Sequence, residues 1–364
     1  MITRKTYPCV FALHALLPLS SLILLVDQPV ALCDDAPPAK ESVDESSPFS
    51  IANLKTRHQT EHYAIAGTTD IDQEQLEEMG WMLEVMHRQY VMTFGEPAGP
   101  PPPRPVKRVN KPAQRNPKSN SRRTPPAKEK PKAKNDDALA LPPDGERFRV
   151  VVLKDGIQYN TYCGKQINST IRAENAGGYF SSKLGALILI YASNANEREV
   201  AVCRQGFDQF IAKKMPIAPP WVREGLGEYF ETGQIGSTNV TYTKIQTFAW
   251  ANLLRAVNAR LAIPLHDLIN ATQKEFDDTS PAPGMSSQVT ITKQRLYRME
   301  SYSFVHFLLS DKGGSRRLKE FLQELAEAGG GTGSTITEKY FDGKTCERIT
   351  KAWTEHVRKM AKRK

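Results

Sequence analysis

Cysteine is scarce in this chain, which has five among 364 residues. Cys9 and Cys33 fall within the first 33 residues, and Cys163, Cys203 and Cys346 remain in the rest. Small disulfide-built domains need a dense and usually even set of cysteines, so this number excludes that class and leaves at least one thiol free. Cys203 lies on an apolar helix face and is predicted to be a core residue rather than a nucleophile.

A long hydrophobic run is also missing. The most apolar stretch, residues 10–26, has 17 residues, whereas a helix that spans a bilayer needs roughly 20. It follows Arg4 and Lys5 and precedes Ala31-Leu32-Cys33, which is the order of a cleaved signal peptide. Residues 1–33 are therefore predicted to direct export to the periplasm, the cell envelope or the medium. An uncleaved membrane anchor is the alternative.

Apolar residues are nearly absent from residues 97–135, which contain Pro100 to Pro103 and twelve Lys or Arg against the single Glu129. The remainder has 37 Lys and Arg against 39 Asp and Glu, so the basic excess belongs to this segment. Such a composition cannot bury a core, and residues 97–146 are predicted to be a disordered insertion, as residues 34–57 are a disordered linker. The insertion is expected to be a solvated spacer, with weak polyanion contact through 97–135 as the alternative. It has no aromatic residue to stack on bases, so specific nucleic-acid binding is not expected.

The rest of the chain predicts one α+β domain, formed by residues 58–96 and 147–361. Short apolar runs with β-branched residues indicate strands at Glu61–Gly67, Phe148–Leu153, Gly177–Ser182 and Ala186–Tyr191. Helical spacing of apolar residues indicates helices at Asp70–Phe94, Gly156–Cys163, Lys244–Arg260, Leu265–Ala271, Lys293–Leu309, Arg316–Ala328 and Lys344–Met360.

Residues 197–231 predict two helices joined by a proline turn. The first has apolar residues spaced by three and four, with Arg204 and Asp208 on the stripe beside them. Pro216 cannot continue that helix, and Pro219 or Pro220 suits the start of the next. Both helices have an apolar face, so we expect them to pack together.

The second helix contains Trp221-Val222-Arg223-Glu224-Gly225-Leu226-Gly227-Glu228-Tyr229. This phrase resembles the Trp-x-x-Glu-Gly-x-x-Glu-Tyr of the gluzincin zinc peptidases. Residues 58–96 and 148–360 resemble exported bacterial domains of unknown function in that clan. The resemblance implies a zincin-like fold, with a small mixed sheet followed by a mainly helical C-terminal half. It implies that Glu224 stands at the position of the third metal ligand, and that a sheet edge near Gly178 cradles peptide.

The same family has His-Glu-x-x-His on the preceding helix, where this chain has Arg204-Gln205-Gly206-Phe207-Asp208. Arg204 has no lone pair to give a metal, and Gln205 cannot act as a base. Asp208 and Glu224 alone make a poor zinc site, so no metal and no cofactor are expected. Our hypothesis is that the Arg204 guanidinium fills the metal's place, between the carboxylates of Asp208 and Glu224. The alternative is an ordinary exposed pair of Arg204 and Asp208.

Four further residues are candidates for a cleft or for orienting its ligands: Glu228, Tyr229, His306 and Gly178. A lone histidine in an apolar helix is more often a packing residue, and this holds for His306. The resemblance therefore predicts an exported, non-catalytic pseudopeptidase that binds a peptide, a protein or a wall component. The alternative is a metal-dependent hydrolase with a rebuilt site, in which Asp208, Glu224 and either His306 or Glu228 hold zinc.

Overall fold

The computed structural model describes residues 54, 56–105, 147–166, 177–192, 194–237, 239–242, 247–282, 291–329 and 333–362. The predicted signal peptide at 1–33, nearly all of the predicted linker at 34–57 and residues 106–146 of the predicted insertion lie outside these ranges.

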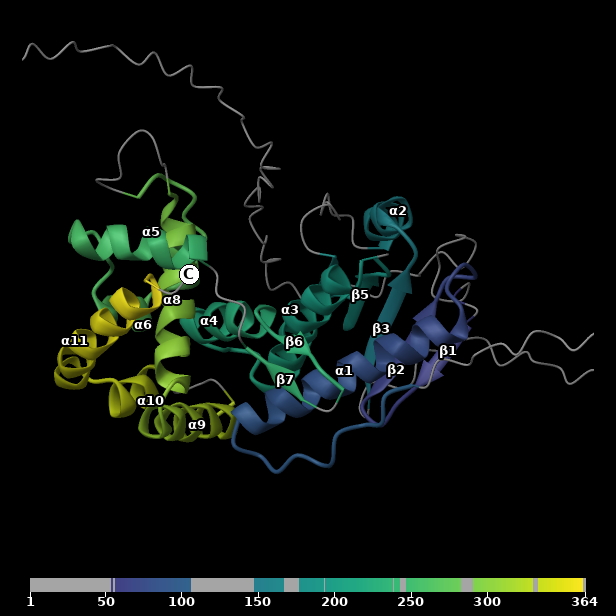
Figure 1. The fold of residues 1–364 in the computed structure, drawn as a ribbon, viewed down its shortest axis with the longest axis horizontal. Coiled ribbons are helices and arrows are strands. Elements are labelled where there is room, and N and C mark those ends of the chain that lie inside the picture. The colour runs from purple at the N-terminus through teal and green to yellow at the C-terminus, as the bar shows by residue number, and fades with distance from the viewer. Residues whose placement is uncertain are drawn as a thin grey trace, which may run out of the picture.

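A five-stranded mixed sheet forms one half of the molecule, in the order β1-β2-β3-β5-β4 (Figure 1). The strands are β1 Thr56–Gln59, β2 Tyr63–Gly67, β3 Phe148–Leu153, β4 Gly178–Ser181 and β5 Ala186–Ile190. The central strands β2, β3 and β5 are parallel, and the outer strands β1 and β4 are antiparallel to their neighbours. The predicted α+β class is confirmed.

Helices cover both faces of this sheet. Val150 and Val152 of β3 pack into the larger core with α1 (Gln73–Thr93) and α3 (Ala195–Lys214). Val151 and Leu153 point to the opposite face and pack into a smaller core with α2 (Gly156–Gln166). This alternation is the period of two that a strand buried on both faces requires.

The other half of the molecule is mainly helical and lies beside the sheet, on the left in Figure 1. Its helices are α4 Pro220–Glu231, α5 Thr247–Asn258, α6 Leu265–Asn270, α7 Gln273–Phe276, α8 Lys293–Leu309, α9 Lys312–Glu327, α10 Gly333–Tyr340 and α11 Gly343–Met360. A Cβ on Gly225 of α4 would lie 2.7 Å from the backbone oxygen of Ser301 on α8, so only glycine permits this close packing of α4 against α8. Trp221 is fully buried against Phe304 and Phe321 and anchors α4 in this half.

Several elements were not predicted. The strand β1 is polar and lies at the edge of the sheet, so it lacks the apolar alternation that marks a strand. It begins at Thr56, and Leu54 before it is buried in the smaller core, so the predicted linker end at residue 57 is wrong. The short helices α7 and α10 and the two-residue strands β6 (Gln234–Ile235) and β7 (Val240–Thr241) are too short for periodicity to reveal.

The first residues of the predicted basic insertion pack against α1. The Arg88 Nε donates a hydrogen bond of 2.8 Å to the Gly99 carbonyl, and the Arg104 guanidinium lies over the Trp81 ring at 4.9 Å. The predicted start of the insertion at residue 97 is therefore too early by at least the eight residues 97–104. The composition of this segment excludes a core, but proline and arginine can still contact a helix.

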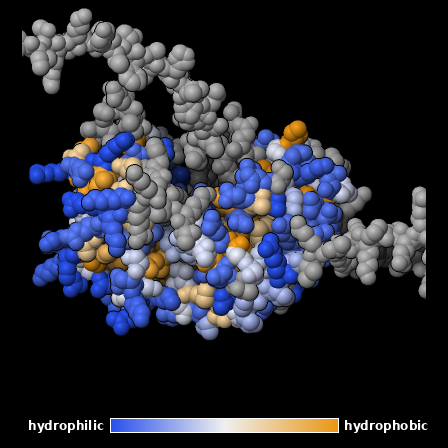
Figure 2. All heavy atoms as spheres, in the orientation of Figure 1, coloured by the Kyte–Doolittle hydropathy of each residue, from blue (hydrophilic) through white to orange (hydrophobic). Residues whose placement is uncertain are grey.

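Hydrophilic residues spread over the face in Figure 2, with hydrophobic residues in small separate groups between them. Within the described ranges, no helix is both long and apolar enough to cross a membrane. Cys163, Cys203 and Cys346 are buried free thiols, as the sequence predicted for at least one of them.

Candidate functional site

The Arg204 guanidinium lies between two carboxylates. Its Nη2 is 3.0 Å from Glu224 Oε2 on α4, and its Nε is 3.5 Å from Asp208 Oδ2, one turn further along α3. The side chains of Arg204, Asp208 and Glu224 are 14%, 24% and 7% exposed. The alternative of an ordinary exposed pair is therefore wrong, since Arg204 joins two helices below the surface.

Gly227 makes room for this guanidinium. A Cβ at that position would lie 2.1 Å from Arg204 Nη1 and 2.6 Å from Arg204 Cζ. The second glycine of the Glu-Gly-Leu-Gly-Glu phrase thus forms the surface on which the arginine rests, while the first permits the contact of α4 with α8. Both glycines of this phrase therefore have a structural role in the packing of α4.

Two more arginines approach Glu224. Arg298 Nε of α8 is 3.4 Å from Glu224 Oε2, and Arg223 Nε is 3.6 Å from Oε1. Burial alone would raise the pKa of Glu224, but Arg204, Arg298 and Arg223 outweigh it and lower that pKa to about 2. Glu224 is therefore a carboxylate at every physiological pH.

Asp208 responds in the opposite direction. Its burial raises its pKa, and the attraction of Arg204 does not fully compensate because Glu224 repels a second negative charge. Burial also disfavours the charged guanidinium, but the two carboxylates together raise the Arg204 pKa well above its ordinary value. The cluster of Arg204, Asp208 and Glu224 thus holds a permanent cation, matched mainly by Glu224.

This arrangement offers no metal site as it stands. The guanidinium supplies five N–H donors and no lone pair, and it takes up the oxygens that would otherwise bind an ion. Gln205 is half-buried beside it and has no ionisable group. We name Arg204, Asp208 and Glu224 the arginine cluster.

The other predicted site residues lie around this cluster or apart from it. Glu228 is half-buried one turn after Glu224 and helps to raise the Arg204 pKa. The Tyr229 ring stacks on Tyr242 at 4.5 Å and meets the edge of His306 at 6.2 Å. His306 Nδ1 lies 3.0 Å from His356 Nε2 of α11, so this histidine belongs to a packed interface of helices.

Gly178 lies in the outer strand β4, in register with Leu189 of β5. Among the contacts of the described residues, none joins Gly178 to the arginine cluster. A Cβ at Gly206 would meet the hydroxyl of Tyr90 at 3.2 Å. That hydroxyl donates to the carbonyl of Cys203 at 3.0 Å and so ties α1 to α3.

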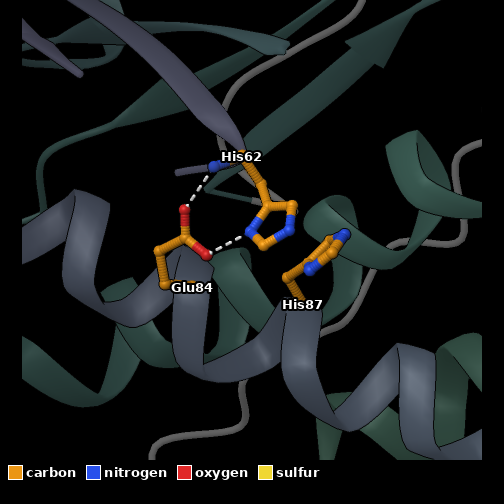
Figure 3. Close-up of side chains that lie close together, drawn as sticks. All are labelled: His62, Glu84 and His87. Carbon is orange, nitrogen blue, oxygen red and sulfur yellow. Dashed lines mark hydrogen bonds and ion pairs between the residues drawn. The ribbon is translucent and has the colours of Figure 1, made fainter. Parts of the chain in front are cut away.

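A second group of polar side chains lies at the start of β2. His62 Nδ1 is 2.7 Å from Glu84 Oε2, and the His87 ring stacks on the His62 ring with centroids 4.0 Å apart (Figure 3). One ligand atom from each of the three residues can be chosen so that all lie within 4.8 Å of one another. We name His62, Glu84 and His87 the histidine cluster.

The sequence analysis missed the histidine cluster. Glu84 and His87 are three residues apart on a predicted helix, so their shared face could have been noted. His62 gave no signal, because only the tertiary packing of the turn between β1 and β2 brings it to α1. The chain matches no family model and no curated protein, so the chemistry of these two clusters has to be argued from their own residues.

Proposed function

We propose that this protein is a non-catalytic relative of the gluzincin peptidases, exported to the cell envelope or beyond, which binds a peptide or an envelope component without cutting it. The observation that supports this function is the buried Arg204 guanidinium bound to Glu224 at 3.0 Å. In an active gluzincin the corresponding carboxylate would face a zinc ion, whereas here it faces a cation without Lewis acidity.

The outer strand β4 supplies a surface for such binding. The backbone N–H of Ile190 donates to the Gly177 carbonyl, so Tyr179 and Ser181 are the residues that exchange hydrogen bonds with β5. The N–H and C=O groups of Gly178 and Phe180 therefore point away from β5. Such groups can pair with an extended peptide added as a further strand, a common mode of peptide recognition.

Restoring the metal ligands tests the relationship to gluzincins. The triple variant Arg204→His, Gln205→Glu, Asp208→His places two imidazoles and Glu224 around the volume that the guanidinium leaves. We expect it to hold one zinc ion more than the parent chain after dialysis against zinc, measured by plasma emission spectrometry. The matched control adds Glu224→Ala to the triple variant, and it should lose that ion. A folded triple variant that gains no zinc would contradict a gluzincin-like scaffold.

Proline and alanine at one position test the binding surface. Phe180→Pro removes an outward N–H of β4, which an edge strand tolerates, and Phe180→Ala removes the same side chain but keeps the N–H. We expect a pool of labelled random-sequence peptides to bind the parent chain and the alanine variant, by fluorescence anisotropy, and to bind the proline variant at least tenfold more weakly. Equal binding by both variants would remove β4 from the proposal. Hydrolysis of the peptides by the parent chain would overturn the non-catalytic function itself.

A further inference from the structure

We propose that the histidine cluster binds a divalent transition-metal ion of the zinc type, with His62, Glu84 and His87 as its three protein ligands. This site shares no residue with the arginine cluster, and it does not depend on the proposed peptide binding.

The set of ligands suits such an ion. Two imidazoles and one carboxylate are a combination that holds zinc in three-ligand sites and that also suits other borderline divalent ions. Glu84 and His87 are three residues apart on α1, so both side chains leave the same face of the helix. Figure 3 shows both of them directed toward His62, which comes from the turn before β2.

The backbone fixes His62 on both sides. Its N–H donates to Glu84 Oε1 at 2.7 Å, and its carbonyl accepts the N–H of Phe148 at 2.7 Å. Gly80, one turn before Glu84, lets the turn lie close to α1, because a Cβ there would meet His58 at 2.8 Å and Thr60 at 2.9 Å. The backbone of the turn is therefore held in a fixed position beside α1.

His87 is the observation that points to a ligand. It is only 9% exposed, it lies among the rings of Tyr63, Phe148 and Phe210, and neither of its ring nitrogens has a hydrogen bond within the described part of the chain. A neutral imidazole has one ring nitrogen without a proton, and the lone pair of that nitrogen can bind a metal ion.

The charges around the cluster nearly balance before an ion arrives. Glu84 is buried and supplies the carboxylate, while the Lys213 ammonium of α3 lies nearby, over the Phe148 ring at 4.8 Å. A dipositive ion is repelled by the Lys213 ammonium. It gains Glu84 as a direct partner, and it leaves both imidazoles neutral.

Small side-chain movements bring the ligands to bonding positions. Two ligand atoms on a tetrahedral ion with bonds of 2.0–2.1 Å are about 3.3 Å apart. The distance between His62 Nδ1 and Glu84 Oε2 therefore has to increase from 2.7 Å. The largest distance among the three ligand atoms, at most 4.8 Å, has to decrease. The stacked rings of His62 and His87 have to turn edge-on to each other. The His62 side chain is 39% exposed, so it is free to turn, and its solvent side leaves a fourth position for water.

The test uses the full chain, freed of metal with a chelator and then titrated with Zn²⁺ by isothermal calorimetry and with Co²⁺ by visible absorption. We expect one ion per chain. His62→Ala and Glu84→Gln should each weaken zinc binding at least tenfold, while His266→Ala, which removes an exposed histidine of α6, and Glu224→Gln should leave it unchanged. Far-ultraviolet circular dichroism shows whether each variant is folded.

A second measurement locates the ion without relying on substitutions. Zinc should slow hydrogen exchange of the amides of residues 60–63 and of the α1 turn around Glu84, because it ties the turn to the helix, and should not change exchange in α4. Absence of zinc binding by the folded parent chain would overturn the proposal. So would unchanged binding by both His62→Ala and Glu84→Gln, or protection of α4 instead of α1.

Discussion

The arginine cluster and the histidine cluster solve the same electrostatic problem in two ways. Each has a buried carboxylate, Glu224 in one and Glu84 in the other, which needs a hydrogen-bonding partner. At Glu224 that partner is Arg204, a cation that cannot lose its proton. At Glu84 it is His62, whose neighbour His87 is neutral at physiological pH.

The difference separates a closed site from an open one. The Arg204 guanidinium is part of the chain and permanently occupies the space beside Glu224. The imidazoles at Glu84 keep lone pairs that only an added proton or metal ion can use. The arginine cluster therefore has a structural role, while the histidine cluster has the side-chain chemistry of a metal site. Four perturbations sharpen this comparison.

Removal of the fixed cation should have the largest effect. Arg204→Met leaves the buried Glu224 and the half-buried Asp208 without the guanidinium between them, and we expect it to lower the free energy of unfolding by about 3 to 5 kcal/mol. Urea denaturation measures this change. The control is Arg316→Met, which breaks the exposed pair of Arg316 with Glu320 on α9 and should cost less than about 0.5 kcal/mol. Equal effects in the two variants would show that the arginine cluster does not stabilise the fold.

Acid should act on the two clusters in different pH ranges. In the metal-free protein, the pKa of His87 is about 4 when folded and about 6.5 when unfolded, so the unfolded chain binds more protons between these values. The contribution of His87 to the free energy of unfolding is therefore fully present above pH 6.5. It decreases by up to about 3 kcal/mol as the pH falls toward 4. The pKa of Glu224 falls from 4.5 to about 2 on folding, so its contribution is lost only below pH 4.5.

Urea denaturation at a series of pH values, with chelator present, checks these ranges. His87→Asn should flatten the slope between pH 6.5 and 4 and leave the slope below pH 4 in place. A variant with the same slope as the parent chain in the upper range would show that His87 is not held neutral by burial.

A single methyl group should disturb the closed site. Gly227→Ala places its Cβ where the Arg204 guanidinium lies, and we expect a loss of about 1 to 3 kcal/mol as the arginine is displaced. Gly164→Ala in α2 is the matched control, since no atom lies within 4 Å of its Cβ and alanine favours a helix by about 0.5 to 1 kcal/mol. Thermal unfolding should therefore shift in opposite directions, and a common shift would contradict the role given to Gly227.

Neutralising the second carboxylate should have the smallest effect. The pKa of Asp208 is raised on folding and its contact with Arg204 is long, so Asp208→Asn should change the free energy of unfolding by less than about 1 kcal/mol. Glu224→Gln leaves Arg204, Arg298 and Arg223 around a neutral amide and should cost clearly more. Equal losses of unfolding free energy in urea denaturation would contradict this difference, because they would show that Arg204 stabilises the two carboxylates equally.

The sequence predicted the helices and central strands of this fold well, because their apolar periodicity is strong. The helix at Lys293–Leu309 agrees with α8 at both ends, and the helix predicted at Asp70–Phe94 contains α1. The strand β1 was not predicted, because an edge strand needs no buried face and its polar residues show no apolar alternation.

The site was predicted in part for a similar reason. Arg204 and Asp208 are four residues apart on one helix, so their contact follows from helical geometry, and the phrase around Glu224 places the second helix. Arg298 could not be anticipated, because it comes from α8, about 75 residues after Glu224. The histidine cluster depends in the same way on a turn and a helix whose separation in space no local pattern determines.

The pairing of β2 with β3 has a consequence for how the chain folds. These neighbours in the sheet are separated by about 80 residues, which include α1 and the whole Lys- and Arg-rich stretch. The entropy of closing a flexible loop grows only with the logarithm of its length, by about 0.6 kcal/mol for each doubling. Lengthening or shortening that stretch should hardly alter the stability of the native state. It should instead change the time needed for the two parts of the sheet to meet, since a parallel pair so distant in sequence must wait for the later part of the chain.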